Sequence, residues 1–199
     1  MKILLIGDAH LKIHDYKSIL NKAMNRHDRS YQLGDFGYYN QYNWWKQQNF
    51  RNAWILKGNH DYPYNHPNVI QKHFEHDLGP KAKVFGIAGA YSTDQLRLVE
   101  GRTWWRDEEL SYAEADKALE DYKRFKPDVM LSHDCPNYVR QLLFGIKDSS
   151  ITSQLLQSCF EAYQPPIWIF GHHHRSKSVQ IEDTKFVCLA ELEALVYEL

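Results

Sequence analysis

Four apolar runs in this chain end directly in residues whose side chains can hold a metal ion. The runs are Ile3–Ile6, Ala53–Leu56, Val129–Leu131 and Ile167–Phe170. Short apolar runs bounded by turn residues are typical of buried strands. In an α/β sheet the functional groups gather at strand ends, because the strands hold them in place and the loops beyond are free to vary. The pattern therefore predicts a sheet-based fold with one polar site at the ends of several strands.

The polar groups come in a fixed order, and a fifth group follows the weaker apolar run Ser30–Leu33. They are Asp8-Ala9-His10, Gly34-Asp35, Gly58-Asn59-His60-Asp61, Ser132-His133-Asp134 and Gly171-His172-His173-His174. A single His or Asp after a strand is usually a cap or a solvated turn residue. A structural need alone would not produce five such groups in this order, so together they indicate one shared site.

The composition is that of an ordinary globular protein. The chain has 199 residues, which suits one domain spanning 1–199, and 43% of them are hydrophobic and 25% charged. A net charge of −1 argues against broad attraction to nucleic acid or to an anionic membrane, but it allows local contacts to a phosphate. With three cysteines lacking metal-type spacing and no long apolar segment, we expect a soluble cytoplasmic protein.

The succession of apolar and polar segments predicts alternating strands and helices, as βαβ units produce. Strands are expected near 2–7, 30–34, 53–57, 84–88 and 128–132, and helices near 15–27, 41–50, 66–76, 108–125 and 151–163. In the helix near 108–125, Ser111 and Glu114 have the spacing of a capping box, and Pro127 would stop the helix.

The end of the chain differs from its first half. Short strands are expected at 178–181, 185–190 and 195–197, separated by tight turns. An αβ half followed by an antiparallel β end suggests two sheets packed face to face, with helices outside. The segment 89–107 is the least regular and is long for a connection, which favours a lid or substrate loop.

The donor types in the five groups favour a pair of metal ions. His, Asp and Asn without nearby Cys suit Mn, Fe, Zn, Ni or Co. The candidate ligands are Asp8, His10, Asp35, Asn59, His133, His172 and His174. Seven ligands are too many for one ion but suit two, with the central Asp35 as the shared carboxylate. In an extended chain His172 and His174 would point the same way, which leaves His173 behind the ligands or at the surface.

Two ions about 4 Å apart generate hydroxide near neutral pH and clamp a phosphoryl group. The predicted reaction is therefore attack on phosphorus by a metal-bridging hydroxide. The leaving alkoxide needs a proton, and His60 lies beside Asn59 without being needed as a ligand. We expect His60 to be the general acid and Asp61 to hold its ring and raise its pKa.

Taken together, the five groups resemble the signature blocks of the calcineurin-like metallophosphoesterases. The blocks extend from residue 8 to residue 174. The resemblance implies an α/β fold in which a double β-sandwich is flanked by helices (αββα) around a dinuclear site. It also implies one ion on Asp8, His10, Asp35 and His174, the other on Asp35, Asn59, His133 and His172, and His60 as the leaving-group acid.

One departure from this resemblance bears on the substrate. Protein Ser/Thr phosphatases of the superfamily carry an acidic-Arg-Gly extension after Gly-Asp, and usually Glu after Asn-His. Here the chain reads Gly34-Asp35-Phe36-Gly37 and Asn59-His60-Asp61. This favours phosphodiesterase and small-phosphatase branches. The alternatives are a phosphomonoesterase, including a protein phosphatase, and a non-enzymatic binding scaffold on the same fold.

Substrate contacts are expected from the irregular loop and from the aromatic residues after Asp35. Arg97, Arg102 and Arg106 are candidates to hold phosphate, or else surface charges. Tyr38 and Trp104 are candidates to stack on a nucleobase, although aromatic residues nearby, such as Trp44 and Trp45, would equally serve as core anchors. The predicted partner is a phosphoester substrate, with nucleotides and nucleic acid as candidate classes, and no membrane.

Overall fold

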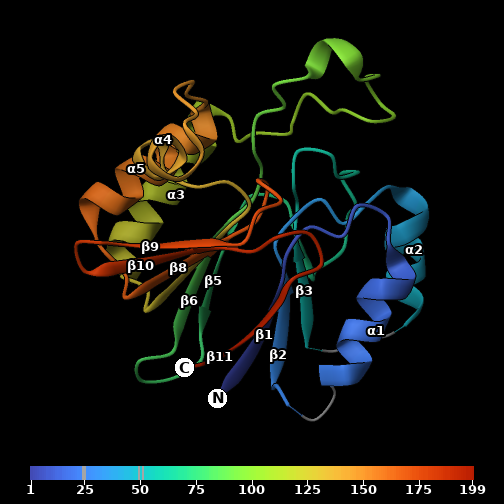
Figure 1. The fold of residues 1–199 in the computed structure, drawn as a ribbon, viewed down its shortest axis with the longest axis horizontal. Helices are drawn as coiled ribbons and strands as arrows, with labels where there is room; N and C mark the ends of the chain where they lie inside the picture. Colours follow the sequence, from blue (N-terminus) through green and yellow to red (C-terminus); the bar gives the residue numbers. More distant parts are fainter. Residues whose placement is uncertain (24–25, 49, 51) are drawn as a thin grey trace.

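The structure is a computed structural model that describes residues 1–23, 26–48, 50 and 52–199. Two β-sheets pack face to face, and helices cover the outer surface of each sheet (Figure 1). The two termini lie at the same end of the molecule, where the Leu199 amide donates to the Met1 carbonyl. The arrangement is the mixed α/β fold class that the sequence predicts.

The first sheet has five strands in the order β11-β1-β2-β3-β4. Its strands are β1 (Lys2–Ile6), β2 (Arg29–Gln32), β3 (Ala53–Leu56), β4 (Val69–Ile70) and β11 (Ala194–Glu198). β1 to β4 run parallel, and β11 pairs with β1 in the antiparallel direction. Helices α1 (Ile13–Ala23) and α2 (Tyr39–Gln47) cover the outer face through a cluster that includes Tyr16, Tyr42 and Trp45.

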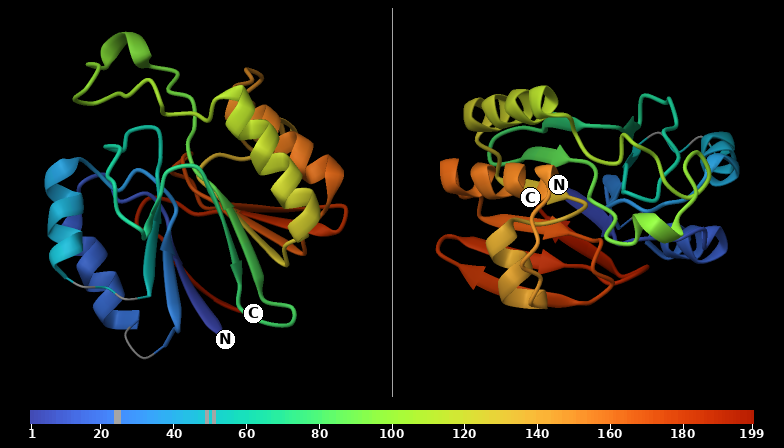
Figure 2. Two further views of the ribbon diagram at one scale, coloured as in Figure 1. Left: turned by 180° about the vertical axis from the view of Figure 1, so that it is seen from behind. Right: turned by 90° about the horizontal axis from the view of Figure 1, so that it is seen from above.

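The second sheet has six strands in the order β5-β6-β7-β8-β10-β9. Its strands are β5 (His73–Asp77), β6 (Lys83–Ile87), β7 (Val129–Ser132), β8 (Ile167–Phe170), β9 (Lys177–Ile181) and β10 (Thr184–Cys188). The inner four run parallel, and β5 and β9 are antiparallel edges. Helices α3 (Tyr112–Phe125), α4 (Asn137–Phe144) and α5 (Ile151–Ala162) cover its outer face (Figure 2).

The apolar runs of the sequence are strands buried on both faces. In β1, Ile3 and Leu5 enter the core between the two sheets, while Leu4 and Ile6 face the helices. β7 behaves in the same way, with Leu131 between the sheets and Met130 against the helices. Strands covered on both sides need apolar residues at consecutive positions. This double burial holds the strand ends, and the groups beyond them, in fixed positions.

The capping box predicted for the helix near 108–125 is present. Ser111 precedes α3 and forms a reciprocal capping box with Glu114. The helix begins at Tyr112, four residues later than expected, and ends at Phe125; the next residue, Lys126, has a left-handed conformation just before Pro127. The helices expected at 15–27 and 41–50 correspond to α1 and α2; residues 24–25 and 49 lie outside the described part of the chain.

The helix predicted near 66–76 is wrong, because this segment forms β4 and β5. β4 pairs with β3, and β5 pairs with β6 in the antiparallel direction. Phe74 of β5 stacks on Tyr31 in the core between the sheets, with ring centroids 5.5 Å apart. Pairing with these strands and the packing of Phe74 on the distant Tyr31 decide the conformation, and they outweigh the local preference for a helix.

The strands expected near the end of the chain form, but they do not make one antiparallel unit. β9 and β10 form a hairpin, and β10 runs parallel to β8. β11 leaves this sheet and completes the edge of the other one beside β1. The last strand therefore joins the two sheets covalently.

The segment 89–107 rises from the end of β6 beyond the edge of both sheets and returns to α3 (Figures 1 and 2). It contains one short 3₁₀ helix, η1 (Gln95–Arg97), and a bridge between Glu100 and Trp104. Among the residues that the structure describes, no helix is both long and apolar enough to span a bilayer.

Candidate metal centre

The five polar groups of the sequence meet at one place, where the loops after β1, β2, β3, β7 and β8 converge. Two sets of side chains there offer donor atoms that all lie within 4.8 Å of one another. The first set is Asp8, His10, Asp35 and His174, and the second is Asp35, His133 and His172. Asp35 belongs to both sets.

In the first set, nitrogen and oxygen atoms face a common point. The Nε2 atoms of His10 and His174 are 2.7 Å apart. His174 Nε2 lies 3.0 Å from Asp8 Oδ2, and His10 Nε2 lies 3.7 Å from the same oxygen and 3.9 Å from Asp35 Oδ2. Two imidazoles and two carboxylates form the mixed donor set that borderline divalent ions accept.

In the second set, a backbone contact decides which nitrogen of His133 is available. His133 Nδ1 donates to the Leu33 carbonyl at 2.6 Å, so Nε2 is the atom that can bind a metal. Nε2 lies 3.0 Å from Asn59 Oδ1 and 3.4 Å from Asp35 Oδ1. Burial alone would lower the pKa of His133, but the Asp35 and Asp8 carboxylates raise it to about 10. This point of the site therefore favours a cation, and a metal ion competes for it with a proton.

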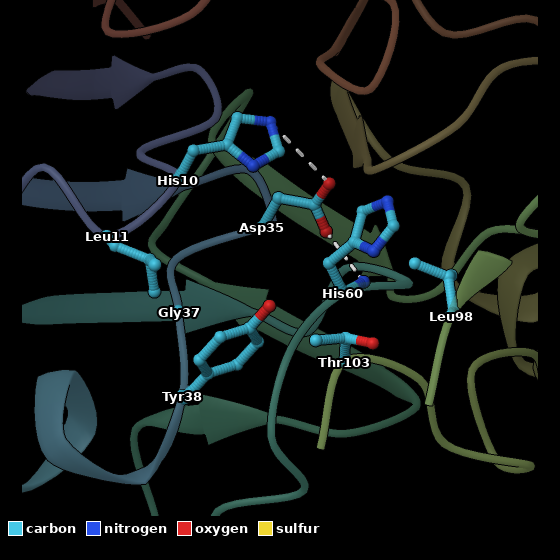
Figure 3. A pocket seen from close by; sticks show the side chains of 8 residues that line it. All are labelled: His10, Leu11, Asp35, Gly37, Tyr38, His60, Leu98 and Thr103. Carbon is cyan, nitrogen blue, oxygen red and sulfur yellow. Dashed lines mark hydrogen bonds and ion pairs between the residues drawn. The ribbon is translucent and has the colours of Figure 1, made fainter. Parts of the chain in front are cut away.

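Asp35 faces both sets with different oxygens. Oδ2 is directed toward His10, while Oδ1 is near His133 and accepts a hydrogen bond from the His60 amide at 3.0 Å (Figure 3). Its backbone has a left-handed conformation, with φ at 53°, and its carbonyl accepts from the amides of Ala9 and His10. One oxygen toward each set is an arrangement in which a carboxylate can bridge two ions.

Two glycines let the backbone pass close to these donors. A Cβ atom on Gly34 would overlap the His133 ring, and one on Gly58 would overlap Asp35 Oδ1. Gly34 also has φ at 103°, which a larger residue rarely adopts. Any side chain at either position would displace a donor, so the loops are shaped around the donor set. The residues present therefore fit two divalent ions.

The side chains of the histidines after β8 are not directed by an extended backbone, which their spacing suggested. His172 and His174 have φ at 65° and 51°, so residues 172–174 are not extended and strand alternation does not explain their directions. The His172 amide donates to Asp8 Oδ1 at 3.0 Å. Burial lowers the pKa of His172 to about 3, which keeps its ring neutral and able to act as a ligand.

His173 lies behind the donor sets, one of the two positions predicted for it, and not at the surface. Its side chain is 6% exposed, and its ring stacks on Phe144 with centroids 4.0 Å apart. Its Nε2 is 3.2 Å from Asp134 Oδ1, and Arg140 Nε is 3.6 Å from the same oxygen. Burial opposes the charge of Asp134, but the hydrogen bond with His173 and the charge of Arg140 hold the pKa of this carboxyl well below its usual range. Asp134 thus balances positive charge next to the ligand loop.

His60 stands at the rim of the site without joining either donor set. Its half-buried side chain lines a cavity of about 280 Å³ together with His10 and Asp35. The remaining lining residues are Leu11, Gly37, Tyr38, Leu98 and Thr103 (Figure 3). A group bound in this cavity would therefore contact donor residues of the first set on one side and His60 on another.

The Asp61 carboxylate contacts the backbone of the site, whereas we expected it to hold the His60 ring. The Asp61 carboxylate accepts hydrogen bonds from the amides of Gly37 and Gly58, at 2.6 and 2.7 Å, and is fully buried. Through these two bonds Asp61 connects two loops of the site, and the hydrogen bonds of the described residues include none between Asp61 and the His60 ring.

The residues proposed for substrate contact divide into two groups. Tyr38 lines the cavity, as expected of a substrate contact. Arg97, Arg102 and Arg106 are exposed, and none of them is among the described residues that line it. Arg106 pairs with Glu100, and Trp104 lines a separate hollow beside Arg106. The expectation that these four residues reach the substrate therefore finds no support in the geometry.

Two buried residues next to the site were missed by the sequence reasoning. Asn59 Nδ2 donates to Ser92 Oγ at 2.9 Å, and Ser92 Oγ donates to Glu108 Oε2 at 2.6 Å. Ser92 is 33 residues from Asn59 and 16 residues from Glu108. Both lie at the ends of the irregular segment, and no spacing pattern connects them to the ligand groups.

The chain is similar to a known family in its sequence and to solved structures in its fold. A family model described as calcineurin-like phosphoesterase matches residues 1–176. A dimetal phosphatase from Danio rerio is similar in structure, with a TM-score of 0.59, 10% identity, and 96% of this chain and 88% of that chain covered. Phosphopantetheinyl hydrolase from Mycobacterium tuberculosis has a TM-score of 0.56, 10% identity, and coverage of 96% and 89%.

A third similar structure is a putative 5′-nucleotidase from Staphylococcus aureus. Its TM-score is 0.58 and its identity 13%, and the alignment covers 98% of this chain and 50% of that chain. No curated protein shows significant sequence similarity to the chain. At these identities the structural likenesses establish the fold alone.

We expect Asp61→Asn to lower the free energy of unfolding by about 1–3 kcal/mol, because an amide group cannot accept from both buried backbone donors. Urea denaturation measures the change. The matched control is Asp77→Asn, since Asp77 accepts from the Gly79 amide at an exposed position; its effect should stay within about 0.5 kcal/mol. Equal stability of the two variants would contradict this role of Asp61.

Proposed function

The chain belongs to the calcineurin-like phosphoesterase family, and on that premise we propose that it hydrolyses a phosphodiester or nucleotide-type phosphoester with two bound metal ions. The family supports phosphoester hydrolysis as the reaction class. The observation that carries the proposal is the pair of donor sets that share Asp35 beside a cavity lined by His60.

Each set of side chains would hold one ion. We assign Asp8, His10, Asp35 and His174 to the first ion, and Asp35, Asn59, His133 and His172 to the second. Divalent ions bound there would supply a hydroxide nucleophile and neutralise charge on the phosphoryl oxygens. Manganese is our leading candidate for both positions, and Fe, Zn, Ni or Co would accept the same donors.

His60 is positioned to give a proton to the leaving oxygen. It comes from the same loop as Asn59, and its ring centroid lies 6.3 Å from that of His10. Its backbone amide is held by Asp35 Oδ1, which fixes the start of the side chain while the imidazole lines the cavity (Figure 3). Alkoxide leaving groups, which are strongly basic anions, have the greatest need for such a donor.

The cavity wall favours an uncharged leaving group. Leu11 and Leu98 provide apolar surface, and Tyr38 and Thr103 add a ring and a hydroxyl. No lysine or arginine is among the described residues that line the cavity, so additional phosphates would find no permanently charged cation there. A flat ring beside Tyr38 would suit a nucleoside or another aromatic alcohol. These contacts support a diester or simple nucleotide substrate over a polyphosphate.

We expect His60→Gln to keep two manganese ions per chain and to slow hydrolysis of alkyl phosphodiesters by about 10²–10⁴-fold. Esters of p-nitrophenol should be affected much less, because p-nitrophenolate leaves without a proton. Steady-state rates on both kinds of ester test this expectation. His14→Gln replaces an exposed histidine of α1 and serves as control. A uniform loss on all esters would argue against the proton-donor role.

Asp35→Asn should remove activity and reduce the binding of both ions, because one neutral amide replaces the carboxylate that both donor sets share. Metal content per chain, measured by mass spectrometry after dialysis against manganese, tests this directly. Asp116→Asn changes an exposed carboxylate on α3 and should retain two ions. Two tightly held ions in the Asp35 variant would show that this carboxylate is not the bridge.

A substrate comparison separates the proposed activity from its alternatives. We expect kcat/KM to be higher for bis-p-nitrophenyl phosphate than for p-nitrophenyl phosphate in the presence of manganese, because the described lining residues include no lysine or arginine to hold a monoester dianion. The reverse preference would favour the phosphomonoesterase alternative, with phosphopeptides as the next substrates to assay. Two bound ions without turnover of any ester would favour the scaffold alternative.

A further inference from the structure

Two consecutive hydrogen bonds connect Asn59 to Ser92, near the beginning of the irregular segment 89–107, and to Glu108, directly after its end. Its Nδ2 atom is 2.9 Å from Ser92 Oγ, which is 2.6 Å from Glu108 Oε2. The exposed fractions of Asn59, Ser92 and Glu108 are 2%, 2% and 3%. We call these three residues the amide relay. Because the relay is buried, each polar atom in it must find its partner within the protein.

The direction of the hydrogen bonds in the relay follows from Glu108. A carboxylate only accepts hydrogen bonds. Glu108 Oε1 accepts from the Ser92 amide at 3.1 Å and from Gln95 Nε2 at 2.6 Å, and Oε2 accepts from the Ser92 hydroxyl. Since that hydroxyl has a single proton, its oxygen can only accept from Asn59. The Asn59 group beside Ser92 is therefore the NH₂ group, and the carbonyl oxygen lies on the opposite side.

The opposite side of the Asn59 amide faces the second donor set. Asn59 Oδ1 is 3.0 Å from His133 Nε2, the nitrogen that is available as a ligand. An amide oxygen binds a cation, whereas an amide NH₂ group has no free lone pair to offer. The two ends of an amide have nearly the same shape, so packing alone would not select between them. Hydrogen bonding must make the selection.

We propose that Glu108, acting through Ser92, is a positioning residue that turns the Asn59 oxygen toward the second metal ion. This inference rests on the proposed dinuclear site. It assigns a role to the segment 89–107 that is separate from lining the cavity. Ser92 and Gln95 lie at the beginning of the segment and Glu108 directly follows its end, so one carboxylate holds both ends together and also orients a ligand.

Glu108→Gln tests the proposal because it keeps the shape of the side chain and changes its hydrogen bonding. The new NH₂ group can donate to Ser92 Oγ, and the Ser92 hydroxyl is then free to donate to Asn59. This arrangement turns the Asn59 NH₂ group toward the second donor set. We expect the second manganese ion to bind about 10–100-fold more weakly, with the first unchanged. Calorimetric titration of the metal-free protein with manganese measures both affinities.

A second substitution distinguishes hydrogen-bond polarity from general disturbance of the structure. In N59D both side-chain oxygens can only accept hydrogen bonds. While the Ser92 hydroxyl donates its proton to Glu108, the carboxylate oxygen at position 59 that lies near Ser92 faces the Ser92 oxygen with no proton between them. Adding Glu108→Gln releases that proton and removes the conflict. We therefore expect Glu108→Gln to weaken binding of the second ion in the unmodified protein and to strengthen it in the N59D background. A merely structural role would weaken it in both.

The controls use neighbouring residues and a second position in the relay. Glu109→Gln makes the same change in a carboxylate that accepts from the Thr152 amide instead, and it should leave both affinities unchanged. Ser92→Ala should weaken the second ion, and Ser92→Thr, which keeps the hydroxyl, should restore it. These two variants carry the test if Glu108→Gln does not fold, as judged from circular dichroism.

The results separate this inference from the proposed function. Unchanged affinity for the second ion in both Glu108→Gln and Ser92→Ala would overturn the relay, while two bound ions and turnover in the unmodified protein would leave the function in place. An unmodified protein that binds fewer than two manganese ions would instead overturn the dinuclear site, and the relay with it.

Discussion

The buried carboxylate of Asp35 is the constraint on which the rest of the site depends. An ionised carboxylate that is 2% exposed requires positive charge or hydrogen bonds around it. Burial would raise the pKa of Asp35, but His133 and the neighbouring His60 and His10 hold it well below its usual range. Through its backbone carbonyl and its side chain, Asp35 connects the loops after β1, β3 and β7. His10, His60 and His133 therefore lie around the negative charge of Asp35.

The two sheets hold in place the loops that carry these side chains. Each strand that leads into the site is buried on both faces, so its end cannot shift without disturbing a core. The loops beyond add close backbone approaches at Gly34 and Gly58. Asp61 adds bonds from Gly37 and Gly58, which hold the second and third loops together. The donors are therefore positioned both by rigid strands and by short-range backbone contacts.

The irregular segment 89–107 serves the site in two ways. Leu98 and Thr103 form part of the cavity wall, so the segment contributes to what the leaving group contacts. Near its ends the segment contacts buried residues: Asp107 is itself exposed but contacts Lys57, which is 1% exposed, and Ser92 contacts Glu108 in the interior. The exposed middle can therefore differ in composition without altering the buried contacts that reach Asn59. The exposed arginines belong to this outer part.

Local spacing was sufficient to predict much of this protein. The candidate ligands, their positions after strands and the Ser111 cap all depend on residues within a few positions of one another. Tertiary contacts decided the rest. The strands that replace the expected helix at 66–76 depend on pairing with β3 and β6. The role of Asp61 depends on two backbone amides, and the orientation of Asn59 depends on Ser92 and Glu108, dozens of residues away. Most of these contacts cannot be predicted from local spacing, because burial and hydrogen-bond direction exist only once the chain has folded.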